Sequence, residues 1–147
     1  MIQKDKNIIT LIIAIAIVII NGLIGHFLAP FEIWTTPLVL IITSLLVAFK
    51  IKNIRIIWKG VLMFLFACFN DILIKLYAGG VHDEEGYGWI TLSLIWGLIP
   101  TFFILYRISY LDDKETKRNK VMALTLFSVL VILHFLLFGN LGLGREY

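Results

Sequence analysis

Five long apolar runs constrain the fold of this 147-residue chain more than any other feature of its sequence. A helix needs about 20 residues to cross the hydrocarbon core of a bilayer, with a range of about 17–25. The runs have these lengths and carry little charge, so each predicts a transmembrane helix: 8–28, 33–49, 60–78, 89–107 and 121–138. A β-barrel is disfavoured, because its strands would alternate apolar and polar residues over about ten positions.

The composition also favours lipid as the solvent of this chain. Hydrophobic residues make up 60% and charged residues 16%, against about 45–50% and 25% in soluble domains. We therefore predict an all-α fold: a polytopic integral membrane bundle of five transmembrane helices, in a single domain of residues 1–147. For the shortest run, 33–49, a re-entrant segment is the alternative. Thr36 followed by Pro37 predicts a helix N-cap with proline at the first helical position.

The distribution of basic residues predicts the orientation in the membrane. Cytoplasmic segments are enriched in Lys and Arg. A cytoplasmic amino terminus places eleven of the thirteen basic residues on the cytoplasmic side, with Arg145 outside and Lys75 within a span: Lys4, Lys6, Lys50, Lys52, Arg55, Lys59, Arg107, Lys114, Lys117, Arg118 and Lys120. The loops 50–59 and 108–120 are then cytoplasmic, whereas the loops 29–32 and 79–88 and the carboxyl terminus lie outside. The richness in Ile, Lys and Asn favours a bacterial source, hence the cytoplasmic (inner) membrane.

The polar residues inside the runs share a depth near the outer surface. At 1.5 Å per residue, Asp71 and Asn21 lie roughly 12 Å below the outer boundary, and the other ionisable groups roughly 5–8 Å below it. Asp71 and Lys75 are spaced i,i+4, so they meet on one helix face. Ionisable residues at membrane depth are candidates for function. We predict one outward-facing polar pocket, lined by Asp71, Lys75, Asn70, Asn21, His26 and His134.

Each of these residues also has a structural interpretation. Lys75 is one turn from the boundary and could extend to the head groups, while Asp71 could be a neutral or paired packing device. Asn70 and Asn21 could form an interhelical amide contact of about 0.6 kcal/mol. His26 and His134 could each bond to a backbone carbonyl.

The segment after the third run carries a histidine and three acids: His82, Asp83, Glu84 and Glu85. Negative charge at a mouth attracts cations, so this loop predicts a cation vestibule; a plain solvated loop is the alternative. Gly79 and Gly80 predict the end of the third helix, and Gly86 and Gly88 a flexible connection before Trp89. In the fourth run, Pro100 beside Gly97 predicts a kink that can act as a hinge.

These features favour transport or conduction of a small solute, ion or proton. Asp71 would bind the ion or proton, and the histidines would relay protons because imidazole titrates near neutral pH. Five spans make a small bundle, so we expect a homo-oligomer or a membrane partner subunit, in contact with the bilayer.

Two other classes of function remain open. One is an accessory or interaction subunit, including an immunity or defence protein. The other is a membrane-embedded enzyme acting on a lipid head group, with a divalent metal held by His26, His82 and His134. We predict no other cofactor and no nucleic-acid partner, because no basic patch alternates with exposed aromatics. No phosphate-binding glycine loop or hydrolase motif occurs, and a single cysteine, Cys68, cannot form an internal disulfide.

Overall fold

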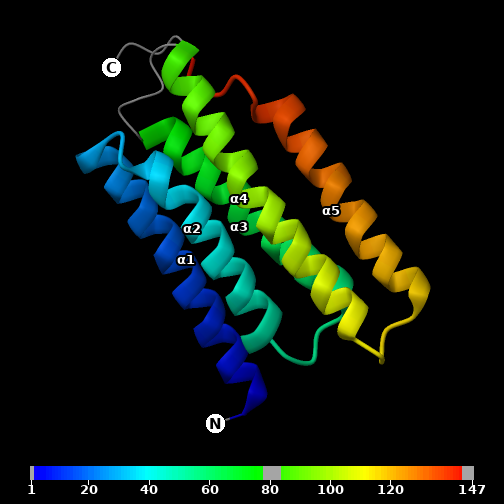
Figure 1. Ribbon diagram of the computed structural model, residues 1–147. Coiled ribbons are helices and arrows are strands. Elements are labelled where there is room, and N and C mark those ends of the chain that lie inside the picture. The colour runs from blue at the N-terminus through cyan, green and yellow to red at the C-terminus, as the bar shows by residue number, and fades with distance from the viewer. Residues whose placement is uncertain (1, 78–83, 144–147) are drawn as a thin grey trace.

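The computed structural model describes residues 2–77 and 84–143, and within these ranges the chain forms helices joined by short turns, without a strand. The helices pack side by side (Figure 1): α1 (Gln3–Leu28), α2 (Glu32–Leu45) with its π-helical continuation η1 (Leu46–Lys50), α3 (Ile56–Tyr77), α4 (Glu84–Leu111) and α5 (Lys117–Phe138). Five helices in this part of the chain are long and apolar enough to span a membrane, counting α2 with η1 as one 19-residue helix. The prediction of an all-α bundle with five such helices is confirmed.

Helix α3 occupies the centre of the bundle. It contacts each of the other four helices, whereas α5 packs chiefly on α3 and lies at the edge of the bundle (Figure 1). The core between the helices is apolar, with Val18, Leu40 and Met63 among its buried side chains. Large apolar side chains also cover the outside, and Leu136 is 75% exposed. An outer surface of this kind suits contact with acyl chains.

The helices extend beyond the apolar runs, so the connections are shorter than predicted. Helix α4 begins at Glu84 instead of Trp89, and Gly86 and Gly88 therefore lie in the helix and not in a flexible loop. The turns 51–55 and 112–116 replace the predicted loops 50–59 and 108–120. Acidic residues favour the first turn of a helix, where they face the positive end of its dipole, which explains why Glu84 and Glu85 join α4. Gly79 and Gly80 lie outside the described residues.

The N-cap predicted at Thr36, with Pro37 as the first helical residue, is wrong. Helix α2 begins at Glu32, and Pro37 lies inside it. Proline has no N–H to donate, so the carbonyl four residues earlier, that of Ile33, loses its bond within the helix. The hydroxyl of Ser93 on α4 donates to this carbonyl at 2.6 Å. A neighbouring helix thus satisfies a backbone group that cannot be left unpaired in a membrane.

Gly97 brings α4 close to α2 at the same level. A Cβ atom at Gly97 would lie 2.8 Å from Cδ2 of Leu40 and 3.1 Å from Cα of Pro37. A side chain at this position would therefore require the Leu40 side chain and the backbone at Pro37 to shift. Helix α4 is assigned as continuous through Pro100, so the hinge at Gly97 and Pro100 stays a prediction.

The compensation of Pro37 by Ser93 can be tested with a double-mutant cycle. Ser93→Ala leaves the carbonyl of Ile33 buried without a donor, and we expect it to lower the free energy of unfolding by about 1–2 kcal/mol. In a Pro37→Ala background the residue at 37 supplies the helical N–H, so the same substitution should cost about 0.5 kcal/mol or less. Unfolding in detergent micelles, followed by circular dichroism, measures both. Equal costs in the two backgrounds would contradict this account.

Candidate functional site

A buried cluster of three ionisable side chains has the carboxylate of Asp71 at its centre. Oδ2 of Asp71 lies 2.8 Å from Nζ of Lys75, on the next turn of α3, and 2.7 Å from Nε2 of His134 on α5. Asp71 and Lys75 are each 1% exposed and His134 is 5% exposed. One carboxylate oxygen therefore accepts from two cationic or titratable groups on two helices. We call Asp71, Lys75 and His134 the charged cluster.

The ammonium group of Lys75 also binds the end of α5. It donates to the carbonyl oxygen of Phe138 at 3.0 Å and lies 3.5 Å from that of Gly139. It also lies 5.8 Å from the centre of the Tyr87 ring on α4. The last carbonyls of a helix have no partner within it and carry negative partial charge, so they suit a cation. Lys75 is therefore buried within the bundle and is not exposed at its surface.

His134 is the polar side chain through which α5 attaches to the centre of the bundle. In α5 the fully buried residues are Ala123, Phe127 and His134. The imidazole packs against the rings of Phe64 and Phe138, with centroid distances of 6.2 and 5.3 Å. An apolar, aromatic surrounding of this kind strengthens the bond to Asp71, because little solvent screens it.

Two atoms of the charged cluster have hydrogen-bonding capacity left. In the described part of the chain, Oδ1 of Asp71 and Nδ1 of His134 are buried and make no hydrogen bond. The thiol of Cys68 lies beside the imidazole. When neutral His134 donates its Nε2 proton to Asp71, its Nδ1 carries a lone pair that can accept a proton. The cluster can therefore take up one more proton without breaking its existing contacts.

A separate polar network joins α1, α2 and α3 at the positions of the two asparagines. The Asn21 amide donates to Oδ1 of Asn70 at 2.8 Å and to the hydroxyl of Thr36 at 3.1 Å. The hydroxyl of Thr35 donates to Oδ1 of Asn21. This arrangement has the geometry of interhelical packing, and in the described residues no bond connects it to the charged cluster.

His26 lies apart from both groups. Its side chain is exposed, and Nδ1 lies 3.0 Å from the carbonyl oxygen of Tyr77. The six residues of the predicted pocket are therefore divided into the charged cluster, the asparagine network and His26 at the surface. Asn70 and Asp71 are neighbours in α3, but they face different helices because successive side chains point about 100° apart.

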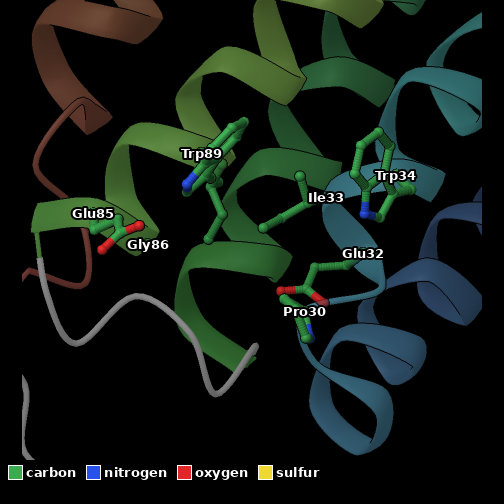
Figure 2. A pocket seen from close by; sticks show the side chains of 8 residues that line it. Pro30, Glu32, Ile33, Trp34, Glu85, Gly86 and Trp89 are labelled. Atoms are coloured by element: carbon green, nitrogen blue, oxygen red, sulfur yellow. The ribbon is translucent and has the colours of Figure 1, made fainter.

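The acidic end of α4 borders a pocket of about 370 Å³. Of the predicted vestibule residues, His82 and Asp83 lie outside the described part of the chain, whereas Glu84 and Glu85 are exposed in the first turn of α4. Glu85 lines this pocket with Trp89 of α4 and with Glu32 and Trp34 of α2 (Figure 2). Glu32 and Glu85 thus place acidic side chains around this pocket. That the pocket attracts cations stays a prediction.

Glu32 was predicted as an ordinary loop residue, and the structure buries it. It is 1% exposed, and neither carboxylate oxygen has a hydrogen-bond partner in any other described residue. The sequence gives no signal for this burial, because Glu32 lies two residues after Pro30 at the edge of an apolar run. The bonds of Thr35 and Thr36 to Asn21 were also not predicted. Hydroxyls in membrane helices usually bond to carbonyls of their own helix, so the sequence does not indicate a partner on another helix.

The three histidines proposed as metal ligands are not brought together where the structure describes them. His26 and His134 have different partners, and His82 lies outside the described ranges. Within residues 2–77 and 84–143, no group of three His, Cys, Asp or Glu side chains could hold a metal ion. The side chains that the structure does bring together can exchange protons, through Asp71 and His134, and can pair a cation with a carboxylate, as Lys75 does with Asp71.

The charge of Asp71 should stabilise the fold. Asp71→Asn preserves the shape of the side chain but leaves the ammonium of Lys75 without a counter-ion, and we expect a loss of about 3 kcal/mol in the free energy of unfolding. Lys75→Met in the same background should recover part of this loss. Asp113→Asn, at an exposed turn position, is the matched control and should cost less than about 0.5 kcal/mol. Equal unfolding curves for Asp71→Asn and Asp113→Asn would show that the pair does not stabilise the bundle.

Comparison of the chain with protein-family models, with curated proteins and with solved structures gave no match. The functional conclusion therefore depends on the geometry of the charged cluster.

Proposed function

We propose that this chain is a small integral membrane protein that transports or conducts a small ion, with the proton as the first candidate, by way of the charged cluster. One observation supports this function above the others: a single buried carboxylate oxygen is shared by an ammonium and an imidazole, while the second oxygen of Asp71 and Nδ1 of His134 make no hydrogen bond in the described chain. Ionisable groups of this kind are costly within a membrane and mark ion or proton pathways.

Charge balance explains how the cluster would work. With Lys75 protonated, Asp71 ionised and His134 neutral, its net charge is zero. One added proton raises the net charge of the cluster to +1. For transport, this proton would then leave the cluster toward the other side of the membrane. His134 would take up one proton at Nδ1 and release another from Nε2 to the carboxylate of Asp71. Proton transfer through the imidazole would then run from Nδ1 toward Asp71.

The cluster needs a route on each side. On the outer side, Glu85 and its pocket would concentrate cations near the bundle. On the inner side the described core has buried hydroxyls such as Ser44 and Thr101 among apolar side chains such as Met63, but no buried ionisable side chain that could pass the proton on. A path inward therefore requires movement of α4, for which Gly97 and Pro100 are the candidate hinge, or a second copy or partner subunit that completes it.

An accessory membrane subunit is the competing function, and one observation favours it. Helix α5 is attached with few buried residues, and His134 is one of them. The charged cluster could then serve assembly alone, with the exposed apolar faces contacting a partner. The variants below separate these two functions, because only transport requires that flux depends on the charged cluster.

Cysteine labelling tests the orientation that we propose, with the amino terminus in the cytoplasm of a bacterial cell. The amino terminus and the turns 51–55 and 112–116 lie at the same end of the bundle (Figure 1), and eleven of the thirteen basic residues lie in these segments or within five residues of them. In a Cys68→Ser background, Phe31→Cys should react with a membrane-impermeant maleimide on intact cells, whereas Lys114→Cys should react only after lysis. The reverse pattern would contradict the orientation and leave the charged cluster unaffected.

Proton flux into proteoliposomes tests the function directly. A pH-sensitive dye inside the vesicles, with the potential set by potassium and valinomycin, should report flux above that of empty vesicles. We expect Asp71→Asn and His134→Gln to lower it at least tenfold. Asp113→Asn should leave it unchanged, and so should His26→Gln, because that imidazole lies outside the charged cluster.

Unfolding of each variant in detergent provides the control for folding. A folded Asp71→Asn or His134→Gln protein that keeps full flux would rule out the charged cluster as the pathway. Wild-type protein with no flux above empty vesicles, in the presence of a folded bundle, would favour the accessory function.

A further inference from the structure

A basic pocket lies at the end of the bundle that carries the amino terminus, where the turns 51–55 and 112–116 approach each other. It has a volume of about 720 Å³. Four basic side chains line it, from both turns and from the start of α3: Lys52, Arg55, Lys59 and Lys114. Two acids, Asp112 and Glu115, also line it. These residues carry four positive and two negative formal charges, so the pocket is positive overall.

The two acids are engaged with other groups. Oε1 of Glu115 accepts from the backbone N–H of Ile56 at 3.1 Å, and Oε2 accepts from the Asn119 amide at 2.8 Å. Oδ1 of Asp112 accepts from the backbone N–H of Lys114 at 3.0 Å. No ion pair joins the acidic and basic side chains of this described region. The positive charges of Lys52, Arg55 and Lys114 are therefore available to a ligand.

The backbone that carries these cations is fixed by its neighbours. The side chain of Asn7 on α1 donates to the carbonyl of Lys52 at 2.8 Å and accepts from its N–H at 3.2 Å. Ile51 and Ile56 are buried on either side of the turn. Asn53 has a φ of 61°, in the left-handed region that Asn tolerates better than most residues. Ligand binding at this site would therefore require little ordering of the backbone around Lys52.

An apolar groove continues from the basic pocket along the outside of the bundle. The two share Phe49 and Ile108, and the groove extends past Leu45, Ile99 and Phe103 with a volume of about 410 Å³. It lies between α2 with η1 and α4, on the surface that faces the acyl chains if the helices span a membrane. We call it the acyl groove.

We propose that the basic pocket and the acyl groove together bind an anionic phospholipid. The phosphate would lie among Lys52, Arg55 and Lys114, and one acyl chain would lie along the groove beside Phe49 and Ile99. Basic pockets between helices at the membrane surface favour anionic head groups. The shared residues favour a lipid over a soluble phosphate, because the groove needs an apolar occupant. This site is separate from the charged cluster, and binding at equilibrium does not depend on flux.

Lipid binding can be measured by native mass spectrometry of the full chain in neutral detergent. Titration with phosphatidylglycerol should give a Kd at least tenfold lower than titration with phosphatidylcholine. The triple variant Lys52→Gln, Arg55→Gln, Lys114→Gln should raise the Kd for phosphatidylglycerol at least tenfold. The control triple variant is Lys4→Gln, Lys6→Gln, Arg118→Gln. It removes the same number of exposed positive charges at the same end of the bundle, and it should change the Kd for phosphatidylglycerol less than twofold.

Two further measurements separate a lipid from a free phosphate. Glycerol phosphate, which has the head group without acyl chains, should bind at least a hundredfold more weakly than phosphatidylglycerol. Ile99→Trp should fill the groove and weaken lipid binding at least fivefold, whereas Leu136→Trp, on an exposed face elsewhere, should not. Unfolding temperatures without added lipid check that each variant is folded.

Four outcomes would overturn the proposal. The first is equal affinity for the two phospholipids, and the second is equal behaviour of the two triple variants. The third is glycerol phosphate binding as tightly as the lipid, and the fourth is Ile99→Trp binding lipid as the wild type does. Either of the last two results would show that the acyl groove is not used.

Discussion

The contact between the carboxylate of Asp71 and the imidazole of His134 joins the edge helix α5 to the central helix α3. Helices in lipid gain little from burying apolar surface, because acyl chains are as apolar as the core. Helix α5 buries few residues, and its end is held by Asp71 through His134 and by Lys75 through the carbonyl of Phe138. These polar contacts fix the position and rotation of α5 where apolar packing alone specifies them weakly.

The same principle recurs along the other helix pairs. Asn21, Thr36 and Asn70 join α1, α2 and α3, and Ser93 joins α4 to the carbonyl that Pro37 releases on α2. Each contact satisfies a polar group that lipid cannot. The groups that we propose to carry protons are therefore also part of the assembly, so stability and flux must be measured on the same variants before either is assigned to Asp71.

The two ends of the bundle differ in charge and in the kind of ligand that they could bind. One end has Glu32 and Glu85 around a pocket flanked by tryptophans, and the other has the basic pocket with its apolar groove. A cation approaching the first end and an anionic lipid held at the second are chemically independent. They nevertheless agree with one orientation, because basic residues prefer the cytoplasmic side.

The sequence by itself determined the helices, their number and the pairing of Asp71 with Lys75, because these follow from apolar run length and from i,i+4 spacing within one helix. Only the tertiary structure decided that His134 reaches Asp71 from 63 positions away, that His26 lies at the surface and that Glu32 is buried. The physical reason is that lipid-facing and core-facing side chains are both apolar in a membrane bundle. The pattern of the sequence therefore leaves the rotation of each helix open, and contacts between helices set it.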